Sequence, residues 1–164
     1  MFVQSVAGRD DESLGPSGRR EADSSAMEFL RIDSEDRELI EAARDVLRRN
    51  YDPVKHTVGA AVRSGSGRIY TGINIKACAY RPCAEPIALG AAFSNGEKQI
   101  VTIVAVGKEG QAYPILPPCG NCRQLLIDYA PGAMVILNGE QQAVVKTSAR
   151  NLLPGAYTSD FEDA

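Results

Sequence analysis

Residues 100–106 read Ile-Val-Thr-Ile-Val-Ala-Val, and this run decides the class of fold. A continuous apolar run of this length is typical of a strand covered on both faces, because a strand with one face in water alternates apolar and polar residues. Helical patterns flank the run at about residues 83–94 and 120–129. The sequence therefore predicts a central buried strand between two helices, as in an α/β domain.

Four further segments have strand-like composition: 57–63, 68–75, 133–137 and 143–146. Ser64-Gly65-Ser66-Gly67 separates the first two and indicates a hairpin, and Asn138-Gly139 is a turn signal between the last two. Strands and helices alternate in the middle of the chain. We expect a three-layer α/β/α domain with a mixed five-stranded sheet, the first two strands antiparallel and the later ones joined by crossover helices.

The N-terminal part of the chain divides into a polar segment and a helix. Residues 1–27 are rich in Gly, Ser, Asp, Glu and Arg without a sustained period, so we expect a flexible arm with little to bury. Residues 28–164 are expected to form a single domain. Within it, Asp33 or Ser34 caps a helix that runs to about Arg49, in which apolar residues recur at helical spacing.

Size and charge limit the kinds of partner. A chain of 164 residues fits one hydrophobic core. Its net charge of -3 gives no broad basic surface, so a small substrate is favoured over a nucleic-acid polymer. No apolar run approaches the ~18 to 20 residues that span a bilayer, and the polar start of the chain lacks the apolar core of a secretory signal. We therefore expect a cytoplasmic protein without membrane contact.

All four cysteines lie between Cys78 and Cys122. In a reducing cytoplasm such a cluster indicates metal ligands or reactive thiols rather than disulfides. Three of the four fall at predicted helix starts, in Cys83-Ala84-Glu85 and in Pro118-Cys119-Gly120-Asn121-Cys122-Arg123-Gln124. Catalytic zinc usually takes three protein ligands and keeps a fourth position for water, whereas structural zinc takes four. Cys83, Cys119 and Cys122 therefore predict an open zinc site.

Such a site needs compensation for its negative charge. Three thiolates on one zinc ion leave a charge of about -1, which weakens the pull of the metal on its water. Two helix N-termini that face the sulfurs offset part of this charge, and Arg123, next to Cys122, is predicted to add a full positive charge. Glu85 lies two residues beyond Cys83, where it can take a proton from water and return it to a leaving amine.

This pattern resembles the cytidine deaminase superfamily, whose motif runs Cys or His, any residue, Glu, then Pro-Cys-x-x-Cys. The resemblance extends over about residues 51–157. It includes three further segments besides the two metal motifs: Val58-Gly59-Ala60-Ala61, Gly72-Ile73-Asn74 and Leu152-Leu153-Pro154. The resemblance implies a cytidine deaminase-like fold and a homotetramer.

The resemblance also implies the chemistry and the roles of residues. It identifies Cys83, Cys119 and Cys122 as ligands of one Zn2+ ion and Glu85 as the proton shuttle. Asn74 would hold a sugar hydroxyl, and Ala84 would lie with it among the substrate-binding residues. The implied reaction is hydrolytic attack of an activated water on C4 of the cytosine ring of a small nucleoside, which releases ammonia and leaves the uracil nucleoside.

Two positions depart from the usual family pattern. Ordinary cytidine deaminases carry Asn-x-Glu, with an acid that helps to grip the ribose 3'-hydroxyl, where this chain has Asn74-Ile75-Lys76. If Lys76 points inward it favours a substrate with an anionic or acceptor group, and a solvent-facing lysine is the alternative. The tetrameric branch usually has Arg directly after the catalytic Glu, where this chain has Pro86. Arg123 or a neighbouring group must then ease the thiolate charge.

The segment from Asn74 to Cys83 is shorter than in typical cytidine deaminases and is similar to that of blasticidin S deaminase. Residues 103–107, Ile-Val-Ala-Val-Gly, carry the same similarity. That enzyme inactivates a cytosine nucleoside antibiotic whose modified sugar bears a carboxylate, which Lys76 could meet. A deaminase of antibiotic nucleosides is therefore the nearest alternative function.

Two more distant functions stay open. A polynucleotide-editing enzyme would carry a basic groove with interleaved aromatic residues, and the six Tyr and four Phe of this chain show no such clustering. An inert zinc-stabilised interaction module would explain the cysteines, but it would have no use for Glu85.

Four single residues carry two interpretations each. His56 lies where the family often places an aromatic near the base, so it either binds the substrate by stacking on cytosine or packs as an ordinary side chain. Cys78 could close the metal site as a fourth ligand, but no helix start precedes it, and we expect a plain small residue. Tyr157 and Phe161 either reach the pocket or stay on the surface.

Overall fold

The computed structural model describes residues 27–139 and 143–157. Three helices are present in this part: α1 (Ser34–Asn50), α2 (Ala84–Ser94) and α3 (Gly120–Tyr129). Seven strands accompany them: β1 (Leu30–Arg31), β2 (Val58–Ser64), β3 (Ile69–Ile73), β4 (Ile100–Gly107), β5 (Ile115–Leu116), β6 (Met134–Asn138) and β7 (Val144–Ser148). Apart from its last residue, the arm predicted at 1–27 lies outside the described residues.

All seven strands form one mixed sheet, in the order β1-β7-β6-β4-β2-β3 with β5 paired to β4. The pair β4–β6 is parallel and the other pairs are antiparallel. A mixed sheet in an α/β fold is confirmed, and the predicted count of five strands is wrong. The two strands that the sequence missed have two residues each, too few to show an alternating pattern.

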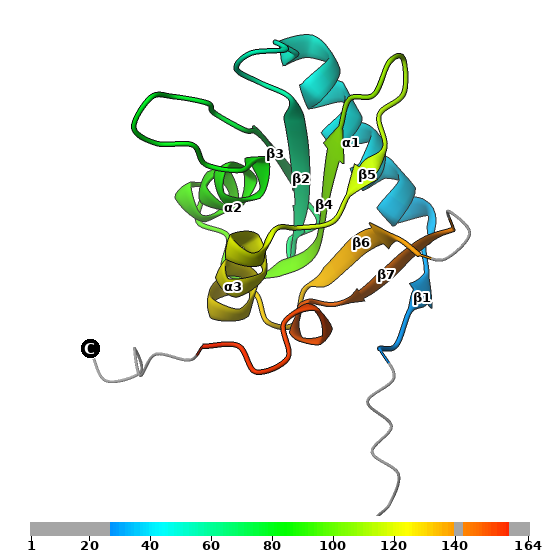
Figure 1. Cartoon of the computed structure of the whole chain (residues 1–164). Coiled ribbons are helices and arrows are strands. Elements are labelled where there is room, and N and C mark those ends of the chain that lie inside the picture. Colours follow the sequence, from blue (N-terminus) through cyan, green and yellow to red (C-terminus); the bar gives the residue numbers. More distant parts are fainter. Residues whose placement is uncertain (1–26, 140–142, 158–164) are drawn as a thin grey trace, which may run out of the picture.

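The helices pack on the sheet through two separate apolar clusters. Successive strand residues point to opposite faces. On β2 and β4, Ala61 and Val104 lie in the cluster with α1, while Ala60 and Ile103 lie in the cluster with α2 and α3. Figure 1 shows α1 on one side of the sheet and α2 and α3 on the other. The central strand β4 is almost fully buried, as its sequence predicts.

Helix α1 begins at a capping box. The Asp33 side chain accepts from the backbone N–H of Asp36, and the Asp36 side chain accepts from that of Asp33, each at 3.0 Å. Lys146 of β7 contacts the two carboxylates at 2.8 and 2.6 Å. These contacts fasten the start of α1 to β7, the strand next to the edge strand β1. No helix in the described ranges is long and apolar enough to cross a membrane.

Strand β3 and helix α2 approach each other closely at Gly72. A Cβ atom on this residue would lie 2.5 Å from the backbone N of Ala88 and 2.7 Å from the carbonyl oxygen of Ala84. Only glycine allows the strand backbone to lie this near the first turn of the helix. This close contact fixes the position of the first turn of α2 relative to β3. It therefore also fixes the positions of Cys83 and Glu85.

Candidate metal centre and its cavity

Two helix N-termini meet at one end of the sheet, and each begins with a cysteine. Cys83 is the N-cap of α2 and Cys119 is the N-cap of α3, both with extended backbone. Cys122 lies in the first turn of α3 and is fully buried. The helix starts predicted from the sequence therefore bring the three thiols together, at the ends where helices carry partial positive charge.

The three Sγ atoms have the spacing of a metal site. They lie within 4.8 Å of one another, and both Cys83–Cys119 and Cys119–Cys122 are 3.6 Å apart. Tetrahedral zinc with Zn–S bonds of ~2.3 Å places its sulfurs about 3.8 Å apart. All three cysteines are free thiols, as is Cys78, which is exposed and lies outside the group. Three soft donors at this spacing fit zinc.

Burial favours the neutral form of the three thiols and so raises their pKa values. Hydrogen bonds near the helix N-termini counteract this effect to a different extent at each cysteine. Burial raises the pKa of Cys122, and the neighbouring Glu85 carboxylate adds to this effect. Burial and the Cys119 thiol likewise raise the pKa of Cys83. At Cys119 burial is outweighed by the backbone N–H groups of Cys122 and Asn121 and by thiol hydrogen bonds, so its pKa is lowered. Three thiolates side by side therefore need a cation among them.

Glu85 lies in the first turn of α2 and is only 5% exposed. Burial raises its pKa, against hydrogen bonds from its own backbone N–H and the Cys122 thiol. A raised pKa suits a carboxyl group that has to take up and release a proton near neutral pH. Glu85 is thus beside the sulfur group without belonging to it.

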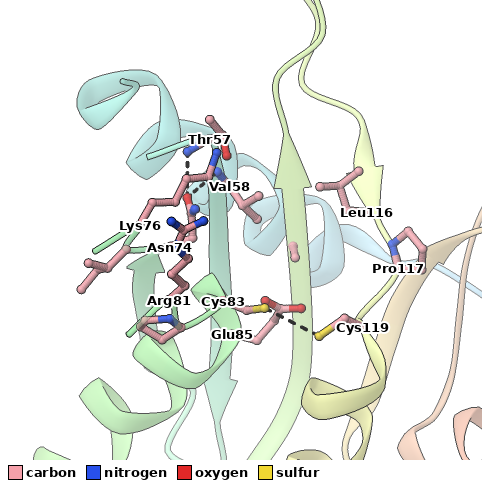
Figure 2. Close-up of a pocket in the computed structure, with 13 residues that line it drawn as sticks. Thr57, Val58, Asn74, Lys76, Arg81, Cys83, Glu85, Leu116, Pro117 and Cys119 are labelled. Atoms are coloured by element: carbon pink, nitrogen blue, oxygen red, sulfur yellow. Dashed lines mark hydrogen bonds between the residues drawn. The ribbon is translucent and has the colours of Figure 1, made fainter. Parts of the chain in front are cut away.

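A cavity of about 330 Å³ opens onto this group. Cys83, Cys119 and Glu85 lie at its base, with Leu116 and Pro117 on one wall (Figure 2). The opposite wall carries Thr57, Val58, Asn74, Lys76 and Arg81. The volume is at the small end for ligand sites, which suits a ligand of nucleoside size rather than a polymer.

Asn74 is held firmly on its wall. Its Oδ1 accepts from the backbone N–H groups of Thr57 and Val58 at 2.7 and 2.8 Å (Figure 2). Its carbonyl oxygen lies 2.8 Å from Nδ1 of His56. His56 itself does not line the cavity, so its contact with the site runs through Asn74.

The remaining predicted residues, Arg123, Ala84, Tyr157 and Phe161, do not line the cavity or lie outside the described residues. The Arg123 guanidinium donates from Nε to the Pro118 carbonyl at 2.9 Å and from Nη1 to the Leu152 carbonyl at 3.1 Å, which ties the start of α3 to the turn at Ala149–Leu152. Ala84 is fully buried under α2 and does not line the cavity. Tyr157 is 74% exposed, and Phe161 lies outside the described residues.

Sequence reasoning missed Arg81, which lines the cavity with Lys76. The predicted strand 68–75 ends early, at Ile73, because the Asn74 side chain turns to bond with β2. The chain then loops back to Cys83. The shortness of this segment was the only sequence signal, and it does not reveal which side chains face the cavity.

The sequence of this chain is similar to those of known proteins. Residues 33–138 match the family described as the cytidine and deoxycytidylate deaminase zinc-binding region. A blasticidin-S deaminase of Bacillus cereus is 40% identical over 141 residues, covering 80% of this chain and 99% of that protein. A cytidine deaminase of Halalkalibacterium halodurans is 35% identical over 106 residues, covering 63% of this chain and 78% of that protein.

Solved structures show the same similarity. The crystal structure of a cytidine deaminase from Burkholderia pseudomallei has a TM-score of 0.62 and 35% identity, and covers 74% of this chain and 98% of that one. The cytidine deaminase of Mycobacterium tuberculosis has a TM-score of 0.63 and 27% identity, with 77% of this chain and all of that one covered.

Proposed function

Because this chain belongs to the cytidine and deoxycytidylate deaminase family of zinc-dependent hydrolases, we propose that it converts a cytosine nucleoside and water into the uracil nucleoside and ammonia. The observation that carries this proposal is the group of three thiols within 4.8 Å, at the base of a cavity that also exposes Glu85.

The chain's own residues divide the work. Cys83, Cys119 and Cys122 would hold the zinc ion, and the N-termini of α2 and α3 stabilise their thiolates. Zinc, when bound in such a site, lowers the pKa of water to about 7 and so provides a nucleophile at neutral pH. The apolar wall at Leu116 and Pro117 limits the water around the substrate.

Glu85 carries the protons. Its carboxylate accepts one proton from the attacking water and delivers it to the ring, and a second transfer passes a proton to the exocyclic amine. The C–O bond at C4 forms first, as the double bond between C4 and N3 becomes a single bond. The second proton comes from the new hydroxyl at C4, and C4=O forms as the bond to the protonated amine breaks and ammonia leaves. Its position near the thiols and its burial, which raises the pKa, support this role.

The other predicted residues would bind or position the substrate. Asn74 faces the sugar from the wall of the cavity, and His56 holds Asn74 through its carbonyl. Ala84 would act through its backbone, since its side chain is buried. Arg123 would ease the thiolate charge from the start of α3, where it also donates to the carbonyl next to Cys119.

A second candidate is the deamination of blasticidin S or a related antibiotic nucleoside. The B. cereus protein that matches 80% of this chain carries that name, and Lys76 lines the cavity where a carboxylate on the sugar would need a partner. Ammonia release from cytidine, deoxycytidine and blasticidin S separates the two candidates. A clear preference for either of the first two supports the main proposal, a preference for blasticidin S supports the second, and release from none contradicts both.

We further propose that residues 28–164 form one domain, that the chain assembles as a homotetramer as the family resemblance implies, and that it works in the cytoplasm, where four free cysteines stay reduced. Sedimentation of the zinc-loaded protein tests the assembly, and a monomer at micromolar concentration would contradict it.

A further inference from the structure

The loop between β3 and α2 closes like a hairpin. Two backbone hydrogen bonds join its halves: Ile75 N to Pro82 O at 3.1 Å and Ala77 N to Tyr80 O at 3.2 Å. Their register places Lys76 directly opposite Arg81. In antiparallel pairs, residues opposite each other point to the same side, and here both side chains line the cavity.

Two like charges directly opposite each other are unfavourable, so this pairing has a cost unless a negative partner relieves it. Neither Lys76 nor Arg81 belongs to an ion pair within the described ranges. Among the residues that line the cavity, Glu85 is the only acid, and it is buried at the base. No described residue neutralises the two exposed cations, so an anionic group of a ligand in the cavity would find both of them free to bind it.

Arg81 is oriented for such a partner. Its Nε donates to the carbonyl of Ala77 at 3.1 Å, within the same loop. This bond fixes the plane of the guanidinium and leaves the two terminal nitrogens as donors, the geometry that receives a carboxylate or phosphate. Figure 2 shows Lys76 and Arg81 on the wall that also carries Asn74.

Asn74 adds a third donor. Its Oδ1 is occupied by the backbone N–H groups of Thr57 and Val58, which also fixes which side of the amide is oxygen. Every buried side-chain nitrogen and oxygen in the described part of the chain has a partner, yet none accepts from Nδ2 of Asn74. Nδ2 is therefore not fully buried, and Asn74 lines the cavity. Asn74, Lys76 and Arg81 thus offer N–H donors on this wall, where Thr57 adds a hydroxyl and no carboxylate is present.

We propose that Asn74, Lys76 and Arg81 form an anion subsite that selects cytosine nucleosides with a carboxylate or phosphate on the sugar. This inference rests on the proposed function. A neutral sugar hydroxyl can accept from these donors, but it brings no charge to offset the two facing cations. An anionic group accepts from all three residues and removes the repulsion between the two cations.

The test compares three probes with zinc-loaded protein: cytidine, cytidine 5'-carboxylic acid and cytidine 5'-monophosphate. The readout is the ratio of kcat/KM for each anionic probe to kcat/KM for cytidine, from ammonia release. We expect a ratio above about 10 for at least one anion, because hydrogen bonds to charged groups are the strong ones. Preference for the acid identifies a carboxylate subsite, and preference for the monophosphate identifies a phosphate subsite.

Variants K76Q and R81Q should each lower that ratio about 10-fold, and the double variant more. The matched control K98Q removes one positive charge from an exposed residue that does not line this cavity, and it should leave the ratio unchanged. The parent's ratio should also fall as salt is raised, because the rim charges are exposed.

Binding of the uracil products gives the same comparison without turnover. Calorimetry should show uridine 5'-carboxylic acid or uridine 5'-monophosphate binding more tightly than uridine to the parent, with the preference reduced in K76Q and R81Q. If cytidine is deaminated but neither anion is preferred in turnover or binding, the subsite is overturned and the proposed function stands. If no probe releases ammonia, the proposed function fails, and calorimetry still decides the subsite.

Discussion

The Sγ atoms of Cys83 and Cys119 lie 3.6 Å apart although 36 residues separate them in the chain. Each of these cysteines is the N-cap of a helix, and β4 and β5 lie between the two helices in sequence. The packing of both helices on the same sheet therefore brings their N-termini together. As a result, the buried carboxyl group of Glu85, the cavity and the three thiols lie together at the same end of the fold.

The first prediction concerns the thiols. C83A or C119A should reduce the zinc content from about one per chain to a small fraction, because two remaining thiols cannot hold zinc in a three-ligand site. Elemental analysis after desalting measures this. C78A is the matched control, since this thiol is exposed and outside the group, and it should keep its zinc. Loss of zinc in C78A would contradict the assignment of ligands.

The second prediction concerns the contact between β3 and α2. G72A puts a methyl group 2.5 Å from the Ala88 nitrogen, so strand and helix must separate. We expect a loss of about 1–3 kcal/mol in the free energy of unfolding, measured in urea. G90A is the control in the same helix, where an added Cβ meets nothing within 4 Å. It should stabilise by about 0.5–1 kcal/mol, and equal effects of the two substitutions would contradict the account.

The third prediction concerns Arg123, whose guanidinium donates in two directions, to Pro118 and Leu152. R123K keeps the charge but has no planar fork to span both carbonyls. Because neither variant can bridge the two carbonyls, R123K and R123A should lose similar stability, about 1–2 kcal/mol each. R150A on the neighbouring turn, an exposed arginine, is the control and should change stability little. Zinc affinity that survives in R123K but falls in R123A would assign the charge a role of its own.

The fourth prediction concerns pH. A hydrogen bond from Lys146, with backbone donation from Asp36, lowers the pKa of Asp33 to about 2 from 3.8. Since the folded pKa is below the unfolded one, the stabilisation is present above pH 3.8 and is lost as the pH falls through 2. D33N can still cap α1 but lacks the charge. The parent should thus exceed D33N in stability at pH 7, with the gap closing between pH 4 and 2.

Urea unfolding at several pH values measures that gap. D45N, which removes a carboxylate from the exposed side of α1, is the control for a general charge effect. A gap between parent and D33N that stays constant down to pH 2 would contradict the contribution of the Lys146 contact.

The sequence predicted the residues of the metal centre better than it predicted the short strands of the sheet. The thiols and Glu85 are found by local spacing, and helix starts follow from local signals at Cys83 and Cys119. The short strands β1 and β5 depend on long-range pairing, with β7 and β4, that no local pattern reveals. They account for the wrong strand count.

Two features of the site needed three dimensions. The position of Lys76 opposite Arg81 depends on backbone hydrogen bonds within an irregular loop, for which no periodicity exists. Arg123 was predicted from its sequence neighbour Cys122, whereas its hydrogen-bond partners include Leu152, 29 residues away. The spacing of residues in the sequence identifies the residues of the site. Tertiary contacts determine the direction in which each side chain points and the groups that it contacts.

Ammonia release by E85Q tests the central claim most directly. Glutamine keeps the size of the side chain but cannot take up the proton, and Glu85 is not among the three metal-binding thiols. The account predicts that E85Q keeps the parent's zinc content and loses about 10² to 10⁴-fold in kcat on the best cytosine nucleoside. Ammonia release at the parent's rate by zinc-loaded E85Q would contradict it.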